Sequence, residues 1–334
     1  MTDSMLLQWT TQQSEICERI RRSSSPLKIL LKTKNEAHFL QRWIDHHAAI
    51  VGMENLIIFD NDSDDPDVLA TLRRTAEHAT VAQFTGFHNG LHRPAQYPDL
   101  YDAIRGTSEY FILLDTDEFV CWVNSSAEVF FGPAIVPEIK ALPPADILAG
   151  IWLNNYGDRE DRFTLFEDEA VTPSGLMSGK SAVHRSAALR GIYGHNFQLD
   201  GPDLSRVAPG ALLLLHMKNL LPAQRMRVNV EKLRQYSVLS PTEGVEKALQ
   251  MSWQEMRPGN PRQWIREIHM LAGRSPKGTA RRDKLQSGQV RIRGGAPIEF
   301  FSEQQRGMFV DFLGRLGPRL KAGREYRQAT AVKA

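Results

Sequence analysis

The chain has 334 residues, of which 42% are hydrophobic and 24% are charged, and its formal net charge at pH 7 is +2. This is the composition of an ordinary globular protein, and it excludes a disordered chain. The nearly balanced charge gives no support for a nucleic-acid-binding surface, and two cysteines are too few for a disulfide framework or a cysteine-based zinc site.

The N-terminal region, residues 1–26, is expected to form a peripheral packing helix. Residues 5–22 repeat apolar side chains at helical spacing, and Ser23-Ser24-Ser25-Pro26 then breaks the pattern. The region lacks the basic and apolar segments of a signal peptide, and no apolar stretch approaches the roughly 18 residues that span a membrane. The expected location is therefore the cytoplasm, with peripheral contact to a membrane as an alternative.

Strand and helix patterns alternate between residues 27 and 120. Strands are expected at 27–33, 56–59, 80–84 and 110–114, and helices at 37–51, 66–72 and about 96–105. Alternation of this kind predicts an α/β fold with a mostly parallel sheet flanked by helices.

The pattern is looser after residue 120. Further strands are expected at 149–153, 179–184 and 211–216, followed by helices at 222–238, within 245–273 and at 302–321. Residues 274–296 are rich in glycine and arginine, and we expect a loop or a lid there. These patterns predict an α/β domain at 27–238 and a mainly helical region at 239–334.

The strongest functional signal is Asp115-Thr116-Asp117-Glu118, which follows the apolar strand at 110–114. Ligands of open α/β sheets bind at the carboxyl ends of the strands, and buried carboxylates repel one another unless a cation lies between them. Hard oxygen ligands suit Mg²⁺ or Mn²⁺, which usually take their remaining ligands from phosphates and water. Asp115 and Asp117 therefore predict a metal–diphosphate site, with a solvated acidic strand end as the alternative.

Polar clusters also follow the first two strands. Lys34-Asn35-Glu36 comes after the first strand, and Asp60-Asn61-Asp62 comes after the second. Because the carboxyl ends of parallel strands line one edge of a sheet, we expect the three clusters to lie together. Lys34, Asn35, Glu36, Asp60 and Asn61 are then candidates to bind a nucleotide, although Asn and Asp also stabilise turns.

Short motifs occur along the chain in a distinctive order. They are Lys34-Asn35-Glu36, Phe39-Leu40 with Trp43-Ile44 and His46-His47, Phe59-Asp60-Asn61, Leu113-Leu114-Asp115 with Asp117-Glu118-Phe119, Gly179-Lys180-Ser181, Gly194-His195-Asn196-Phe197, and His216-Met217-Lys218-Asn219. Together they resemble the family 2-like and family 92-like glycosyltransferases of the GT-A fold, over roughly residues 27–235. The last motif departs from the His-Tyr and Lys-Ser pattern common in such proteins, which leaves the acceptor open.

The resemblance implies a GT-A domain, with a Rossmann-like sheet, that binds a nucleotide-diphospho-sugar and holds Mn²⁺ or Mg²⁺ at Asp115 and Asp117. A late histidine can complete the metal site in GT-A enzymes, which makes His216 a candidate ligand, and a buried core histidine is the alternative. Lys218 and Arg227 are candidates to bind the diphosphate, although a solvated helix face is the commoner role for a residue such as Arg227.

An inverting transfer also needs a base that takes the proton of the acceptor hydroxyl. The acids downstream of the metal strand are Asp158, Asp161, Asp200 and Asp203. Family-like spacing favours Asp200 or Asp203, beside His195. The competing interpretation is a turn at Asp200-Gly201-Pro202-Asp203.

The resemblance therefore implies a hexosyltransferase that moves a sugar from a nucleotide-diphospho-sugar to a glycan or surface polysaccharide, with inversion because the family it resembles is mostly inverting. A nucleotidyltransferase is one alternative, although Lys34-Asn35-Glu36-Ala37 lacks the glycines of a phosphate-binding loop. A binding protein of the same fold without turnover is another. A phosphatase or nuclease is more distant, because it would need a second metal cluster.

Overall fold

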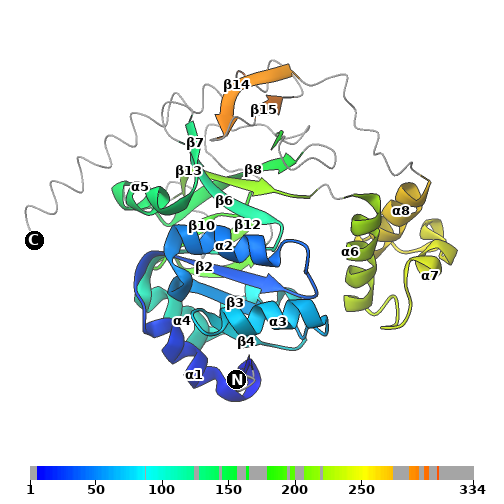
Figure 1. Ribbon diagram of the computed structural model, residues 1–334, viewed down its shortest axis with the longest axis horizontal. Helices are drawn as coiled ribbons and strands as arrows, with labels where there is room; N and C mark the ends of the chain where they lie inside the picture. The colour runs from blue at the N-terminus through cyan, green and yellow to red at the C-terminus, as the bar shows by residue number, and fades with distance from the viewer. Residues whose placement is uncertain are drawn as a thin grey trace, which may run out of the picture.

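The computed structural model describes residues 6–86, 88–123, 128–142, 145–155, 163–164, 179–193, 196–199, 207–218, 221–273, 286–292 and 297–300, together with residue 307. One mixed β-sheet forms the centre, with helices packed on both of its faces, and a group of three helices lies to one side (Figure 1). The prediction of an α/β sheet flanked by helices is therefore confirmed.

The first half of the sheet is parallel, as expected. Strands β2 (Ser25–Thr33), β3 (Leu56–Asp60), β4 (Thr80–Gln83) and β5 (Ser108–Leu114) lie in the order β4-β3-β2-β5, and the short β1 (Leu7–Gln8) pairs with β4. The connections contain α2 (Leu40–Val51), α3 (Pro66–Thr75) and α4 (Pro98–Thr107). Asp65 caps α3 by accepting from the backbone N–H groups of Asp67 and Val68, and Pro66 occupies the first turn.

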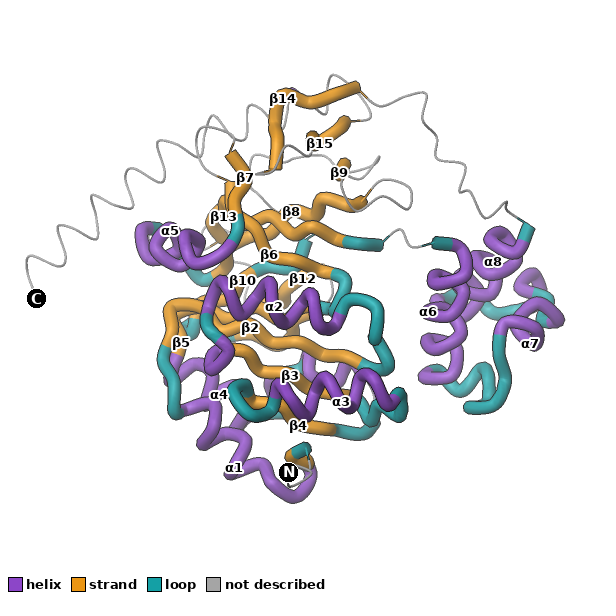
Figure 2. The backbone as a smooth tube through the Cα atoms, viewed as in Figure 1, coloured by secondary structure: helices purple, strands orange, loops and turns teal. Residues whose placement is uncertain are grey.

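Alternate side chains of the parallel strands enter two separate hydrophobic cores. Ile29 and Leu31 point to the face covered by α2, α3 and α5 (Ile135–Ala141), whereas Leu30 points to the face covered by α1 (Trp9–Arg21) and α4. Figure 2 shows the helices on the two sides of the strands. Because both faces are buried, the strands are continuous apolar runs, which is why they can be recognised in the sequence.

The second half of the sheet mixes parallel and antiparallel pairs. It continues from β5 through β10 (Ala182–His184), β8 (Ile147–Asn155), β13 (Val207–His216), β6 (Glu118–Val123) and β7 (Glu128–Phe130). Strand β9 (Phe163–Thr164) pairs with β8, and β11 (Leu189–Tyr193) and β12 (Asn196–Leu199) form a separate hairpin. The strands expected at 149–153 and 211–216 are present, the one expected at 179–184 is present only at residues 182–184, and β6 is an addition.

Helices α6 (Pro222–Gln235), α7 (Val245–Gln250) and α8 (Asn260–Ala272) share a hydrophobic core of their own, and we call residues 222–272 the helical unit. Val230 and Leu233 of α6 pack there with Ile265 and Ile268 of α8. Helix α6, which we expected to close the α/β domain before residue 239, thus shares its core with the region that follows it. At the other end of the chain, α1 packs into one core of the sheet.

Two strands follow the helical unit. Strand β14 (Gln286–Ile292) pairs with β15 (Pro297–Phe300) and with β7, so the expected loop at 274–296 is wrong for residues 286–292. The helix expected at 302–321 lies outside the described residues, apart from residue 307. Short 3₁₀ helices lie at Met53–Asn55 (η1), His88–His92 (η2), Pro94–Gln96 (η3), Gly132–Ala134 (η4) and Trp253–Glu255 (η6).

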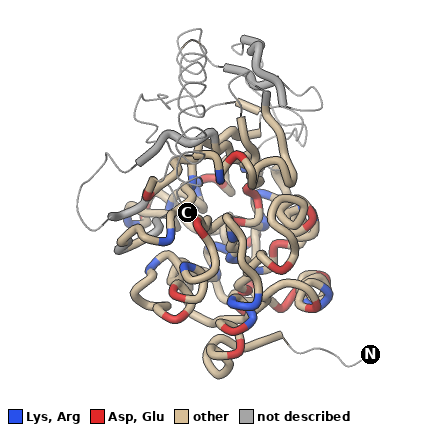
Figure 3. The backbone as a smooth tube through the Cα atoms, turned by 90° about the vertical axis from the view of Figure 1, so that its left-hand side faces the viewer, with Lys and Arg blue, Asp and Glu red and all other residues tan. Residues whose placement is uncertain are grey.

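Charge is distributed evenly over the described chain. Figure 3 shows Lys and Arg interspersed with Asp and Glu along the backbone. None of the described helices is long and apolar enough to cross a lipid bilayer.

Candidate functional site

The three polar clusters lie together at the carboxyl edge of β2, β3 and β5. Asn35 Oδ1 accepts hydrogen bonds from the backbone N–H groups of Asp64 and Asp65, which ties the loop after β2 to the loop after β3. Thr116 Oγ1 lies 3.2 Å from Thr33 Oγ1 and joins the end of β5 to the end of β2. Asn35 has a positive φ of 52°, a conformation that asparagine adopts more readily than most residues.

Asp60 and Asn61 make bonds within the protein at the end of β3. The buried Asp60 carboxylate accepts from Ser63 N–H at 3.1 Å and from Gln83 Nε2 at 3.0 Å. Asn61 Nδ2 lies 3.3 Å from His88 Nδ1. These bonds fit the turn that we gave as the alternative for this cluster, and nucleotide binding by the two residues stays a prediction.

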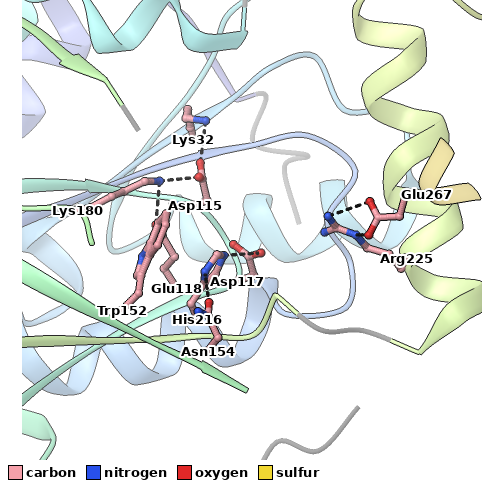
Figure 4. A network of polar contacts seen from close by, with 10 residues as sticks. All are labelled: Lys32, Asp115, Asp117, Glu118, Trp152, Asn154, Lys180, His216, Arg225 and Glu267. Carbon is pink, nitrogen blue, oxygen red and sulfur yellow. Dashed lines mark hydrogen bonds and ion pairs between the residues drawn. The ribbon is translucent and has the colours of Figure 1, made fainter. Parts of the chain in front are cut away.

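Asp115 accepts from two buried lysines (Figure 4). Lys32 Nζ lies 2.7 Å from Asp115 Oδ1, and Lys180 Nζ lies 2.5 Å from Asp115 Oδ2. The lysine side chains are 6% and 4% exposed, whereas that of Asp115 is 40% exposed. Lys180 also lies 2.8 Å from Glu118 Oε2, so two cations and two carboxylates form one cluster, which we call the lysine–acid cluster.

The charges in the lysine–acid cluster depend on one another. Burial would raise the pKa of Asp115, but the charges of Lys180 and Lys32 outweigh it and hold the pKa well below its usual range. Burial would lower the pKa of Lys180, but Asp115 and Glu118 raise it overall. Burial raises the pKa of Glu118 even though Lys180 opposes it. Removing one partner of such a group leaves an uncompensated buried charge, so the four side chains form one electrostatic unit.

Glu118 and Trp152 connect this cluster to His216. Glu118 Oε1 accepts from Trp152 Nε1 at 2.9 Å, and the Trp152 ring stacks on the His216 imidazole with centroids 4.6 Å apart. His216 Nδ1 lies 2.9 Å from the acceptor Asn154 Oδ1, which assigns the proton of the neutral ring to Nδ1. His216 Nε2 then faces Asp117 Oδ2 at 3.4 Å.

The sheet register explains why these distant residues meet. In β13, His216 is the partner of Glu118 in β6 and of Asn154 in β8. The backbone N–H of Met217 donates to the carbonyl of Asp117 at 2.8 Å, which extends the contact one residue beyond the strand. The register of β13 therefore places His216 beside the acidic turn at residues 115–118.

Asp117 and His216 fit a divalent cation. A lone pair on His216 Nε2 repels a carboxylate oxygen at 3.4 Å unless a proton or a cation neutralises it. An imidazole nitrogen beside a carboxylate suits Mn²⁺, which can take further ligands from phosphate and water. Within the described ranges, no three His, Cys, Asp or Glu side chains surround a single metal position. Asp115 as a ligand stays a prediction, and both of its oxygens have lysine partners.

Glu36 is half-buried in the loop after β2, and the charges of Asp117 and Asp115 act on its carboxyl group. Burial and then the charge of Asp117 raise the pKa of Glu36 to about 7. The charge of Lys232, on α6, opposes this rise.

Glu36 should make the stability of the metal-free protein depend on pH between about 4.5 and about 7. In that range the folded state keeps the proton that the unfolded state has lost, so the stabilising contribution present below pH 4.5 is lost as the pH rises to about 7. We expect Glu36→Gln to remove this part of the decline in unfolding free energy, measured by urea denaturation in EDTA. The exposed Glu77→Gln is the control, and equal pH profiles for both variants would contradict the assignment.

Lys180 lies in the site, although we predicted no role for it from the sequence. A Cβ placed on Gly150 would lie 2.0 Å from the Lys180 carbonyl oxygen, and one on Gly179 would lie 2.7 Å from the Gly150 carbonyl oxygen. The two glycines therefore let the segment before β10 lie directly against β8. This close approach places Lys180 next to Asp115, and the Gly179-Lys180-Ser181 motif is the signal that could have found it.

The η2 turn also borders the lysine–acid cluster. Lys32 Nζ donates to Asn89 Oδ1 at 3.0 Å. Burial and the charge of Lys32 lower the pKa of His88 to about 3, so its ring is neutral near pH 7. The sequence around residue 88 shows no pattern that would have predicted the η2 turn to lie beside the lysine–acid cluster.

His46 and His47 of α2 hold the strand that follows the acids. His47 Nε2 accepts from the backbone N–H of Val120 at 3.2 Å, and its Nδ1 donates to the Trp43 carbonyl at 2.8 Å. His46 Nε2 donates to the Val120 carbonyl at 2.7 Å. Burial lowers the pKa of both imidazoles. Both backbone groups of Val120 are thus fixed by neutral side chains from the covering helix.

The remaining predicted residues divide into three groups. Arg227 is exposed on α6, which fits the solvated helix face that we gave as its alternative. Lys34 and Lys218 are half-buried and follow β2 and β13, so both lie on connections that leave the same sheet edge. The residues considered for the base lie outside the described residues: Asp158, Asp161, His195, Asp200 and Asp203.

No family model matches the chain, and no curated protein matches it. Among solved structures, a TarS fragment from S. aureus is 10% identical with a TM-score of 0.31, and the match covers 48% of this chain and 47% of that one. The chain thus spans about half the length of that fragment. The mannosyltransferase PcManGT from Pyrobaculum calidifontis, in complex with GDP-Man and Mn²⁺, is 13% identical with a TM-score of 0.31, covering 75% of this chain and 71% of that one.

A glucosyl-3-phosphoglycerate synthase from Mycobacterium tuberculosis, in complex with Mg²⁺ and uridine diphosphate, gives similar values. It is 14% identical with a TM-score of 0.32, and the match covers 68% of this chain and 84% of that one. Similarities at this level carry no functional argument.

Proposed function

We propose that this protein is a metal-dependent glycosyltransferase that moves a sugar from a nucleotide-diphospho-sugar to a glycan or surface-polysaccharide acceptor. One observation carries the proposal. Asp117 Oδ2 and His216 Nε2 face each other at 3.4 Å, at the carboxyl edge of the parallel strands where α/β sheets bind ligands. The motifs that resemble family 2-like and family 92-like glycosyltransferases of the GT-A fold support the same activity.

In this proposal each described side chain has a separate task. Asp117 and His216 hold Mn²⁺ or Mg²⁺, which when bound supplies Lewis-acid stabilisation of the leaving diphosphate. Each oxygen of the Asp115 carboxylate accepts from one lysine, Lys32 or Lys180. The remaining lone pairs, on the exposed side of the carboxylate, can accept from the ribose hydroxyls of the donor. Trp152 and Asn154 orient the His216 ring, in the way that neighbouring groups commonly orient metal-binding histidines.

The acceptor side of the reaction is proposed from the sequence resemblance. We infer an inverting transfer, with Asp200 or Asp203 beside His195 taking the proton of the acceptor hydroxyl. Lys34, Asn35 and Lys218 are proposed to contact the donor from the strand-end loops.

The proposal is tested by thermal-shift measurements with UDP, GDP, ADP, CDP and dTDP, with and without Mn²⁺. A nucleotide that binds the folded state at about 100 times its Kd adds about 2.7 kcal/mol of stability. We expect one nucleotide to raise the melting temperature only with Mn²⁺, and Asp117→Asn to abolish the rise.

The exposed Asp62→Asn is the matched control and should keep the full rise. Metal-dependent binding without release of sugar from any sugar nucleotide, alone or with acceptor glycans, would favour a binding protein of the same fold. If no nucleotide raises the melting temperature of the wild type, the site does not bind a donor and the proposed function is wrong.

A further inference from the structure

Glu118 is the most deeply buried of the three acids in the turn at residues 115–118. Its side chain is 1% exposed, whereas those of Asp117 and Asp115 are 31% and 40% exposed. Oε2 of Glu118 accepts from Asp115 N–H and from Lys180 Nζ, both at 2.8 Å, and Oε1 accepts from Trp152 Nε1 at 2.9 Å (Figure 4). Because the side chain is buried and both oxygens are bonded inside the protein, Glu118 can act on a ligand only through these partners.

The bonds at Oε2 fix the acidic turn. The backbone N–H of Glu118 donates to the Asp115 carbonyl at 3.2 Å, and the Asp115 N–H donates back to Oε2 of Glu118, so two reciprocal bonds close the turn. Lys180 bonds to the same oxygen and to the Asp115 carboxylate. Glu118 therefore holds the backbone of Asp115 directly and its side chain through Lys180.

The bond at Oε1 leads to His216 through Trp152. Trp152 lies on β8 and Glu118 lies on β6, with β13 between them. Neighbouring strands lie about 4.8 Å apart, so the indole spans about 10 Å to reach the carboxylate. Its ring stacks on the His216 imidazole of β13, with an interplanar angle of 29°. A shift of the indole therefore shifts the surface against which the imidazole rests.

Charge balance alone does not explain this arrangement. The lysine–acid cluster has two ammonium groups and two carboxylates, and their balance requires only that Glu118 lie beside Lys180. The other oxygen of Glu118 instead accepts from a neutral donor, the Trp152 indole, which extends toward His216. Groups that orient a metal-binding histidine commonly change the affinity for the metal by about 10–100-fold.

We propose that Glu118 is a positioning residue of the donor site, in which one carboxylate oxygen holds the turn with Asp115 and the other holds His216 through Trp152. This inference rests on the proposed function, in which Asp115 contacts the ribose and His216 holds the metal ion. One buried carboxylate then fixes the two halves of the donor site relative to each other, although it contacts neither the metal nor the donor.

Glu118→Gln tests the inference because an amide has one acceptor oxygen and one NH₂ group. The oxygen is expected to take the position of Oε2, where two donors need it, so the NH₂ group faces the indole N–H of Trp152. Two donors then oppose each other and disturb the ring that supports His216. We expect the Mn²⁺ affinity to fall about tenfold. It is measured from the electron paramagnetic resonance signal of free Mn²⁺, at one fixed concentration of the nucleotide that the wild type binds.

Trp152→Phe should rescue this variant. Combined with Glu118→Gln it removes the opposing N–H and keeps an aromatic ring beside His216, so the double variant should bind Mn²⁺ more tightly than Glu118→Gln alone. Trp152→Ala leaves the lysine–acid cluster in place and should also weaken Mn²⁺ binding. Ile104→Ala, at a fully buried position of α4, controls for lost stability and should bind Mn²⁺ like the wild type.

Unchanged Mn²⁺ affinity in Glu118→Gln, or no rescue by Trp152→Phe, would show that Glu118 only balances charge and would overturn the inference while leaving the proposed function intact. If Glu118→Gln does not fold, a Trp152→Ala protein with wild-type Mn²⁺ affinity overturns it in the same way. Failure of the wild type to bind any nucleotide would remove the proposed function, and the inference with it.

Discussion

Asp115→Asn is expected to lower the free energy of unfolding by about 2–4 kcal/mol, which is reduced from the 3–5 kcal/mol typical of a fully buried pair because Asp115 is 40% exposed. The substitution removes the carboxylate that lies between Lys32 and Lys180, and Glu118 alone then faces two buried ammonium groups. Urea denaturation at pH 7 measures the effect.

The same chemical change at Asp62 is the control, because that side chain is exposed at the same sheet edge, and it should stay within about 0.5 kcal/mol of the wild type. Adding Lys32→Met to Asp115→Asn should recover part of the loss, since a single lysine then remains beside Glu118. If Asp115→Asn and Asp62→Asn unfold at the same urea concentration, the lysine–acid cluster does not stabilise the fold.

Gly150→Ala is expected to cost about 3 kcal/mol, at the upper end of the range for overpacking. The added Cβ would lie 2.0 Å from the Lys180 carbonyl oxygen, and backbone atoms cannot rotate away as a side chain can. The segment before β10 must then move off β8 and carry Lys180 with it. We therefore expect the Mn²⁺-dependent rise in melting temperature with nucleotide to shrink as well.

Gly106→Ala is the matched control for this variant. Gly106 lies in α4, and a Cβ there meets nothing within 4 Å, so the change should be neutral or should stabilise the protein by about 0.5–1 kcal/mol. A Gly150→Ala protein as stable as Gly106→Ala would show that β8 and the Lys180 segment are not in close contact.

The parallel half of the sheet could be predicted from the sequence because both of its faces are buried. Runs such as Leu56-Ile57-Ile58-Phe59 stand out against polar connections, and Pro66 marks the start of a helix. Strand β6 is harder to recognise, because only three residues separate the end of β5 from its first residue, Glu118, which looks like a continuation of the acidic cluster. The boundary before residue 239 could not be placed from local pattern, since the partners of α6 lie in α8.

The site shows the same division between local and long-range information. Asp115 and Asp117 could be chosen because their chemistry and spacing are local. The partners that give them their properties come from elsewhere: Lys180 lies 65 residues from Asp115 in sequence, and His216 reaches Asn154 only through the pairing of β13 with β8. Such contacts depend on sheet register, which one sequence does not specify.

The two imidazoles on Val120 also protect an unpaired stretch of sheet edge. Beyond β13, β6 pairs with β7 only at Trp122 and Val123, so Val120 lies ahead of that ladder. An open backbone at such a position can template pairing with a second molecule and so start aggregation. His47 prevents this only while it is neutral, because a protonated ring cannot accept the Val120 N–H. Because burial holds the pKa of His47 well below its usual range, the ring stays neutral in mild acid, and this stretch of the sheet edge stays covered there by helix α2.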